Sequence, residues 1–224
     1  MIFNTVSAFI QSNPNATILQ IGGNDGAQDD FIKPIISQYP NTTLHTLEPI
    51  PQYYKELCNT YKDYKNVHCH NYAITNTSGT EFINYIPYNR SMPTWLKGCS
   101  SFFTNKNIID PYWQNIVNNH DVNNYLKNNI IKLQVNTLTF NHFVTQHNIN
   151  NIDILVIDTE GYECEILKQI NLSQFTPHII ILEFHNHSDH DKNTITNILN
   201  SNNYTYNILP MDIVATKNTF QNTL

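Results

Sequence analysis

Short hydrophobic runs alternate with longer segments of mixed composition along this chain of 224 residues. Apolar runs of four to eight residues bounded by turn residues are typical of buried strands. We predict such strands at 17–21, 43–47, 67–73, 153–157 and 179–182. The segments between them predict helices at 5–12, 30–39, 51–61, 139–147, 163–170 and 190–200. Strands that alternate with helices in this way predict an α/β fold with a mainly parallel sheet flanked by helices.

Weaker patterns complete the list of expected elements. Accessory strands are expected at 81–86 and 130–135, and two final strands at 204–209 and 211–216. Residues 87–130 contain several prolines and a glycine that break any long element, so we interpret them as an insertion that serves as a lid or substrate-binding segment. Its aromatic residues are candidates for stacking on an acceptor, or equally for ordinary packing: Trp95, Tyr112 and Trp113. The chain shows no internal repeat and no linker, which predicts one domain over 1–224.

The charge balance narrows the class of partner. The net charge is −6, and the 12 Lys and Arg residues form no cluster, which argues against a nucleic-acid partner. No apolar stretch is long enough to span a membrane, and the N-terminus does not resemble a signal peptide. The four cysteines lack CxxC spacing, so we expect reduced thiols and a cytoplasmic protein.

Glycines directly after the first predicted strand are the first candidate binding feature, in the sequence Ile21-Gly22-Gly23-Asn24-Asp25-Gly26. Glycine lets a backbone turn sharply and approach a ligand closely. The spacing fits neither the dinucleotide fingerprint nor a phosphate loop. Glu48, followed by Pro49, ends the next strand, where a carboxylate can accept hydrogen bonds from both hydroxyls of a ribose. Together these features indicate nucleoside binding, and Asn71, Tyr72 and Ala73 after the third strand are candidates for the adenine edge.

Acidic residues gather after the strand at 153–157, in the sequence Asp158-Thr159-Glu160-Gly161-Tyr162-Glu163, and Glu183 and His185 follow the next strand. Because parallel strands end at the same edge of a sheet, we expect Asp158, Glu160, Glu183 and His185 to converge. Such a group suits a divalent cation such as Mg²⁺ on Asp158, Glu160 and Glu183. It suits equally a catalytic base for a hydroxyl proton, with His185 as the first candidate and Asp158 as the second, and Glu160 is a further catalytic candidate. A third interpretation is that Glu160 or Glu163 only caps the following helix.

These motifs resemble the FkbM family of methyltransferases. The family pattern is carried by Ile21–Gly26, by Glu48-Pro49-Ile50-Pro51, by Asn71-Tyr72-Ala73 and by Ser100-Ser101. The most specific block is Ile152–Glu163, preceded by Thr137-Leu138, and the resemblance extends from about 17 to about 185. The chain departs from many class I methyltransferases at Gln20, where those enzymes have an acid.

The resemblance implies a Rossmann-like class I methyltransferase fold with a seven-stranded sheet, and S-adenosylmethionine as the methyl donor. It implies O-methylation of a sugar hydroxyl on a glycan, a nucleotide sugar or a glycosylated product. By this analogy Ile21–Gly26 pass beneath the methionine part, Glu48 and Pro49 hold the ribose, Asn71–Ala73 lie near the adenine, and Asp158 contacts the cofactor. A methyltransferase of a non-sugar acceptor and a non-catalytic module that binds the same cofactor remain alternatives.

Overall fold

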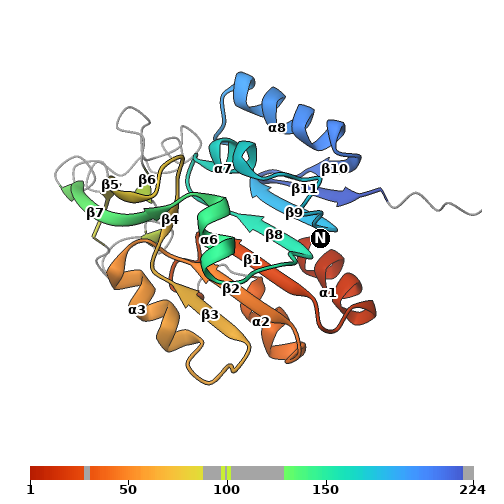
Figure 1. Ribbon diagram of the computed structural model, residues 1–224, viewed down its shortest axis with the longest axis horizontal. Helices are drawn as coiled ribbons and strands as arrows, with labels where there is room; N and C mark the ends of the chain where they lie inside the picture. The colour runs from red at the N-terminus through yellow and green to blue at the C-terminus, as the bar shows by residue number, and fades with distance from the viewer. Residues whose placement is uncertain (28–30, 88–96, 99, 102–128, 219–224) are drawn as a thin grey trace, which may run out of the picture.

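The computed structural model describes residues 1–27, 31–87, 97–98, 100–101 and 129–218 of the chain. Its main sheet has seven strands in the order β10-β11-β9-β8-β1-β2-β3 (Figure 1). These strands are β1 (Thr17–Ile21), β2 (Thr43–Leu47), β3 (Val67–His70), β8 (Ile154–Ile157), β9 (Ile179–Glu183), β10 (Tyr204–Ile208) and β11 (Asp212–Lys217). Neighbours from β9 to β3 pair in parallel, and β11 runs antiparallel to both of its neighbours. The predicted α/β fold is confirmed.

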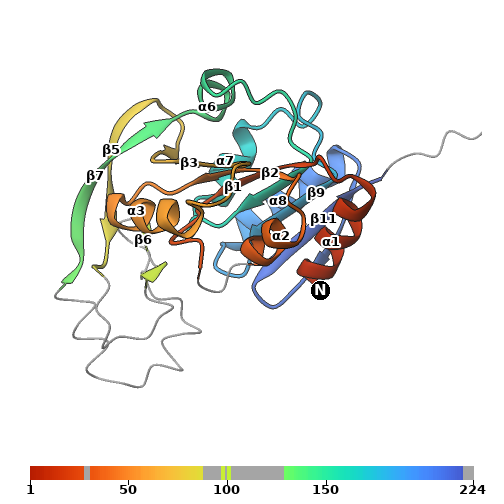
Figure 2. The same ribbon diagram turned by 90° about the horizontal axis from the view of Figure 1, so that it is seen from below.

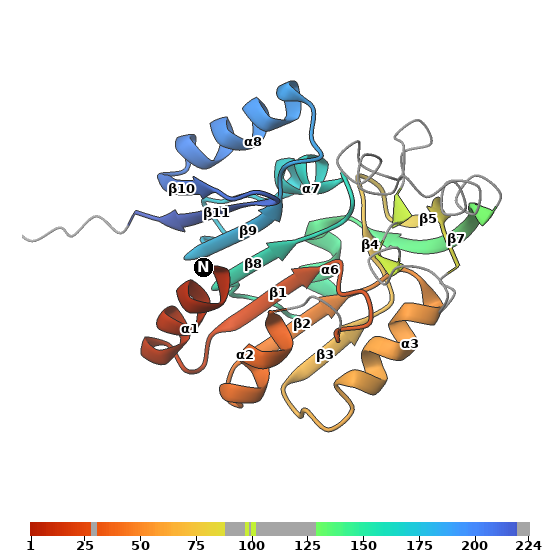
Figure 3. The same ribbon diagram turned by 180° about the vertical axis from the view of Figure 1, so that it is seen from behind.

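Helices cover both faces of the main sheet (Figures 2 and 3). One face carries α1 (Ile2–Ser12), α2 (Ile32–Gln38) and α3 (Pro51–Thr60), and the other carries α6 (Phe140–Gln146), α7 (Glu163–Gln169) and α8 (Asp189–Ser201). Local sequence explains several helix starts. Pro51 occupies the first turn of α3, where proline costs no hydrogen bond. The Thr139 and Ser188 side chains accept backbone N–H bonds at the starts of α6 and α8.

Alternation along the buried strands divides the core between the two faces. Ile18 on β1 packs with residues of α1, α2 and α3, whereas Leu19 packs with residues of α6, α7 and α8. Because successive side chains of a strand point to opposite faces, a strand covered on both sides must be apolar at every position. All four residues of β8 are accordingly buried. This is the physical reason that the apolar runs of the sequence locate the central strands.

A second sheet of four strands lies beyond the carboxyl ends of the parallel strands (Figures 1 and 3). It consists of β4 (Ala73–Ile74), β5 (Gly79–Tyr85), β6 (Ser100–Ser101) and β7 (Ile131–Leu138), in the order β4-β7-β5-β6. The accessory strands expected at 81–86 and 130–135 are therefore β5 and β7, and they pair antiparallel over seven residues. The single strand predicted at 67–73 was wrong, since its first part is β3 and its last residue begins β4 in the other sheet.

The strand order fixes where a ligand can enter. From β1 the sheet is extended on one side by β2 and β3 and on the other side by β8 and β9, which come later in the chain. The strand order therefore reverses beside β1, and open α/β sheets bind ligands at such a switch point. Most of the predicted insertion at 87–130, including Trp95, Tyr112 and Trp113, lies outside the described residues. Within the described part of the chain, no helix has the length and apolar character to cross a membrane.

Candidate functional site

The turn after β1 is held tightly between β2 and β8. The backbone N–H groups of Gly22 and Gly23 both donate to the Leu47 carbonyl, at 3.0 and 2.8 Å. Gly22 has φ +93°, and a Cβ there would lie 1.7 Å from the Asp158 carbonyl oxygen. Only glycine fits a left-handed position with so little space. The turn therefore lies directly against the end of β8.

Glu48 follows β2 and turns its carboxylate back toward the glycine turn. Its Oε2 accepts the Asn24 N–H at 3.0 Å and its Oε1 accepts the Ile50 N–H at 2.8 Å. The residue is only 6% exposed. Burial raises the pKa of Glu48 to about 7, the two backbone N–H bonds oppose that rise, and the carboxylates of Asp158 and Asp25 add to it. A buried carboxylate that titrates near neutrality is typical of a ligand-binding position.

The turn after β8 is organised by Glu163, which is completely buried. One Glu163 oxygen accepts the Thr159 N–H at 2.6 Å and the Thr159 hydroxyl at 3.0 Å, and the other accepts the Gly161 N–H at 3.0 Å. The second oxygen also lies 2.8 Å from His187 Nε2. Burial alone would raise the pKa of Glu163, but His187 and the backbone N–H groups hold it below its usual value. Glu163 thus shapes the turn that presents Asp158 and Glu160.

These turns line a cavity that opens to solvent, with about 630 Å³ of empty space when the part open to solvent is included. The predicted residues that line it are Ile21, Gly22, Asn24, Glu48, Pro49, Tyr72, Ala73, Asp158 and Glu160. Six further residues line the cavity that were not predicted as site residues, although Ser100, Thr159 and Tyr162 belong to the motifs quoted above: Ile74, Ile83, Gly98, Ser100, Thr159 and Tyr162. The sequence placed Ile83 in an expected strand and Ile74 directly after one, but it did not show that these strands form a second sheet whose side chains reach the cavity.

Several predicted residues are absent from the cavity lining. Gly23 and Gly26 pack against α3 and β2. The Asn71 amide donates to the Glu48 and Pro49 carbonyls, at 2.8 and 3.0 Å, so Asn71 supports the Glu48 turn from behind. Asp25 bonds to the Ala27 N–H and forms an ion pair with Lys97, a residue that sequence reasoning missed.

Asp158 and Glu183 come together as predicted, and Glu163 joins them, while Glu160 lies near enough for its charge to act on Glu183. One carboxylate oxygen from each of Asp158, Glu163 and Glu183 lies within 4.8 Å of the other two. Glu183 is 8% exposed, and burial together with the charges of Glu160 and Asp158 raises its pKa to about 11. Its Oε1 accepts the Asn186 amide at 2.8 Å, whereas Oε2 has no hydrogen-bond partner in the part of the chain that the structure describes.

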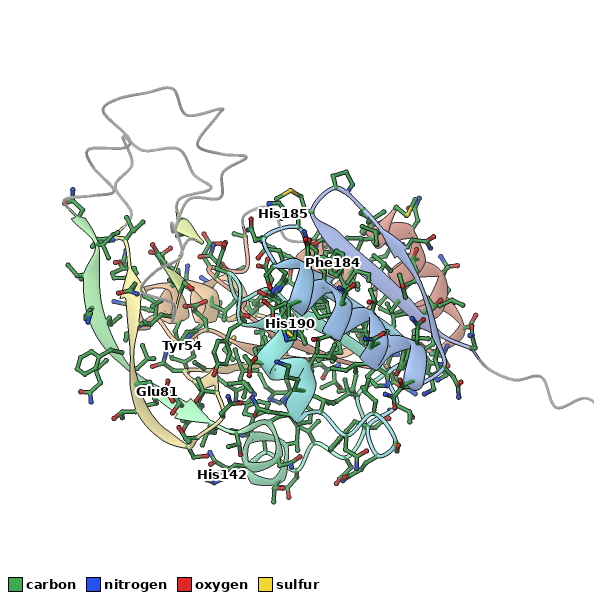
Figure 4. The ribbon with its side chains drawn as sticks, turned by 90° about the horizontal axis from the view of Figure 1, so that it is seen from above. Tyr54, Glu81, His142, Phe184, His185 and His190 are labelled. Atoms are coloured by element: carbon green, nitrogen blue, oxygen red, sulfur yellow. The ribbon has the colours of Figure 1, made fainter. Side chains whose placement is uncertain are left out.

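His185, the first candidate for a base, comes from the loop between β9 and α8 (Figure 4). Its Nδ1 lies 3.6 Å from Glu183 Oε1, and it does not line the cavity among the described residues. Asp158, in contrast, lines the cavity and is exposed.

Comparisons with solved structures find proteins of low sequence identity to this chain. A protein assigned as a caffeoyl-CoA O-methyltransferase from Staphylococcus aureus is 12% identical, with a TM-score of 0.50 and coverage of 96% of this chain and 82% of that chain. Precorrin-6y C5,15-methyltransferase from Geobacter metallireducens is also 12% identical, with a TM-score of 0.47 and coverage of 95% and 88%. Fibrillarin from Aeropyrum pernix, solved with natively bound S-adenosyl-L-methionine, is 12% identical, with a TM-score of 0.44 and coverage of 90% and 66%.

At these identities the structural likeness concerns the fold alone. Among curated proteins, the comparison of sequences finds no match. The model of the methyltransferase FkbM domain, in contrast, matches residues 20–207. Because that match covers most of the 224 residues, the chain belongs to the FkbM family of methyltransferases.

Proposed function

We propose that this S-adenosylmethionine-dependent methyltransferase transfers its methyl group to a hydroxyl oxygen of a sugar. The observation that carries the proposal is the cavity itself, which has Glu48 on one wall and Asp158 on another. The first wall offers the chemistry for a ribose, and the second offers an accessible carboxylate for an acceptor hydroxyl.

The described residues fit the cofactor. We assign the ribose hydroxyls to Glu48, because a buried carboxylate fixed by two backbone N–H groups keeps lone pairs for a diol. The apolar side chains of Ala73, Ile74 and Ile83 suit the adenine ring. We assign the methionine part to the Gly22 turn, which lines the cavity and lies against the Asp158 carbonyl because Gly22 has no Cβ.

The acceptor side of the cavity is polar. Asp158, Thr159 and Glu160 line it from the turn after β8, and Ser100 lines it from β6. Carboxylate and hydroxyl oxygens at several positions can accept hydrogen bonds from a polyhydroxylated ligand. This wall and the family resemblance together support a sugar in preference to an apolar acceptor.

S-adenosylmethionine supplies a methyl group on a positively charged sulfur that leaves as a neutral thioether. The protein's task is to align the acceptor oxygen with that methyl group, an effect that is worth up to several kcal/mol. A sugar hydroxyl is a weak nucleophile at neutral pH, so it also needs a base. We assign this role to Asp158, because it lines the cavity and His185 does not.

We also propose that a divalent cation binds beside Asp158 on the acceptor side of the cavity. Glu163 is an unsuitable ligand, because both of its oxygens are engaged by the turn and by His187. The predicted set of Asp158, Glu160 and Glu183 remains, and Mg²⁺ is commonly held by one or two carboxylates and several waters. Full activity in the presence of EDTA would exclude this cation.

The proposed acceptor is tested by incubating the protein with S-adenosylmethionine and separate panels of glycans, nucleotide sugars, phenols and peptides. S-adenosylhomocysteine release should depend on a sugar, and the product should carry an O-methyl group by mass spectrometry and NMR. Turnover only with phenols or peptides would leave the methyltransferase in place and refute the sugar acceptor. We also propose a cytoplasmic location, which is supported by free thiols at Cys58, Cys69 and Cys164.

A further inference from the structure

Lys97 lies between two carboxylates at the edge of the cofactor turn. Its ammonium forms ion pairs with Asp25 and with Glu56 of α3, and it lies 5.6 Å from the centre of the Tyr53 ring. Lys97 is 8% exposed and Asp25 is equally buried, whereas the Glu56 side chain is 41% exposed. A buried lysine that contacts two acids is firmly placed, because removing it would leave the charge of Asp25 without its partner.

Ser101 fixes the same stretch of chain to the opposite side of the cavity. Its hydroxyl donates to the Glu160 carbonyl at 3.1 Å, and its backbone pairs with Asn84 of β5. Glu160 belongs to the turn after β8 and Asp25 to the turn after β1. Lys97 and Ser101 therefore connect the two turns that bracket the cavity.

Gly98 and Ser100 lie between these two anchors in sequence, and both line the cavity. We call Lys97, Gly98, Ser100 and Ser101 the roof. We propose that Lys97 is a positioning residue for the cofactor, an inference that rests on the proposed cofactor site. Through its pairs with Asp25 and Glu56, Lys97 holds the roof over the cavity. Lys97 itself does not line the cavity, so it acts through Gly98 and Ser100.

Charge favours a lysine at this position. Burial lowers the pKa of Lys97, but the bonds to Asp25 and Glu56 outweigh burial and raise it, so the side chain is cationic across the physiological range. The cation also balances Asp25, whose charge otherwise adds to that of the nearby Glu48. An arginine can form the same two pairs, whereas a methionine of similar length cannot.

The test is calorimetric titration of S-adenosylhomocysteine into wild type, Lys97→Met, Lys97→Arg and the control Lys168→Met. Lys168 is a matched control because it also pairs with a glutamate, but on the exposed surface of α7. We expect Lys97→Met to raise the Kd at least tenfold, with kcat at saturating S-adenosylmethionine changed less than threefold. Lys97→Arg should restore the affinity to within threefold of wild type, and Lys168→Met should leave it unchanged.

Thermal unfolding without ligand separates positioning from a structural role, since a structural lysine would lower the Tm and leave the Kd of the folded protein unchanged. If Lys97→Met does not fold, Glu56→Gln and Ser101→Ala test the inference instead. Each of these variants should raise the Kd for S-adenosylhomocysteine about threefold. Wild-type affinity in a folded Lys97→Met, or in both of the other variants, overturns the inference. Failure of the wild type to bind refutes the proposed cofactor site instead, so the two failures are distinguishable.

Discussion

Glu48 should make cofactor binding depend on pH. The carboxylate has a pKa of about 7 in the ligand-free chain, where 4.5 is the ordinary value. An ionised carboxylate accepts hydrogen bonds from both ribose hydroxyls, whereas the protonated acid must donate one of its own. At pH 6 only about one tenth of Glu48 is ionised, so affinity for S-adenosylhomocysteine should be roughly tenfold lower than above pH 8.

The raised pKa of Glu48 also affects the stability of the ligand-free chain, which should fall as the pH rises, whereas the affinity for the cofactor should increase. The folded-state pKa is raised, so the ligand-free chain loses stability as the pH rises from 4.5 to about 7. The full difference is roughly 3 kcal/mol, and glutamine at position 48 should recover part of it above pH 7. Glutamine offers one acceptor oxygen to the Asn24 and Ile50 N–H groups, where the carboxylate offers two, which reduces the gain by about 1 kcal/mol.

Calorimetric titration at pH 6, 7 and 8 with wild type and Glu48→Gln provides the assay. Wild-type affinity should rise across this range, while the variant should bind at least tenfold more weakly at pH 8 and show no slope. Thermal unfolding of both proteins at pH 5 and pH 8 provides the stability comparison. A flat wild-type profile, or an equal slope in Glu48→Gln, would refute the reasoning.

Three further outcomes are expected. Asp158→Asn should lower kcat at least a hundredfold with little change in the KM for S-adenosylmethionine, as expected for loss of a catalytic base. Release of S-adenosylhomocysteine at a rate within a few-fold of wild type would contradict that role. Gly22→Ala should destabilise the chain by more than about 2 kcal/mol in urea unfolding, because of its positive φ and the Asp158 carbonyl, and an unchanged midpoint would contradict it. His45 and His70, whose Nδ1 and Nε2 lie 3.1 Å apart, have pKa values lowered to about 4 and about 3 by burial and neighbouring histidines. Their lowered pKa values predict stability that is present above pH 6.5 and lost as the pH falls toward 4; His45→Gln should lose less stability between pH 7 and pH 5, and an equal loss would refute the claim.

The central strands and most helices follow from local sequence. Apolar runs such as Asp153–Ile157 mark strands covered on both faces, and Pro51 and Ser188 mark helix starts. The general place of the site follows too, because parallel strands end at one edge and their polar turns must meet there. Glu48 and Asp158 could therefore be predicted to lie at one ligand site without a structure.

What only the structure shows is the role of Glu163. The sequence named Glu160 as a site residue, and Glu160 lines the cavity, whereas Glu163, which the sequence offered only as a helix cap, is buried beneath the turn and accepts its N–H groups. Both positions depend on the conformation of the turn, in which Glu160 has φ +56° and Gly161 has φ +107°. Asn71 is a similar case, since its amide binds the Glu48 turn rather than the cavity.

By itself, the sequence determined the α/β class, the order of the central elements and the family, because each depends on patterns within a few neighbouring residues. Only the tertiary structure decided that β4, β5, β6 and β7 form a second sheet, and that Lys97 pairs with Asp25, 72 residues earlier in the chain. Contacts over such separations depend on how whole elements pack, and no local pattern specifies them.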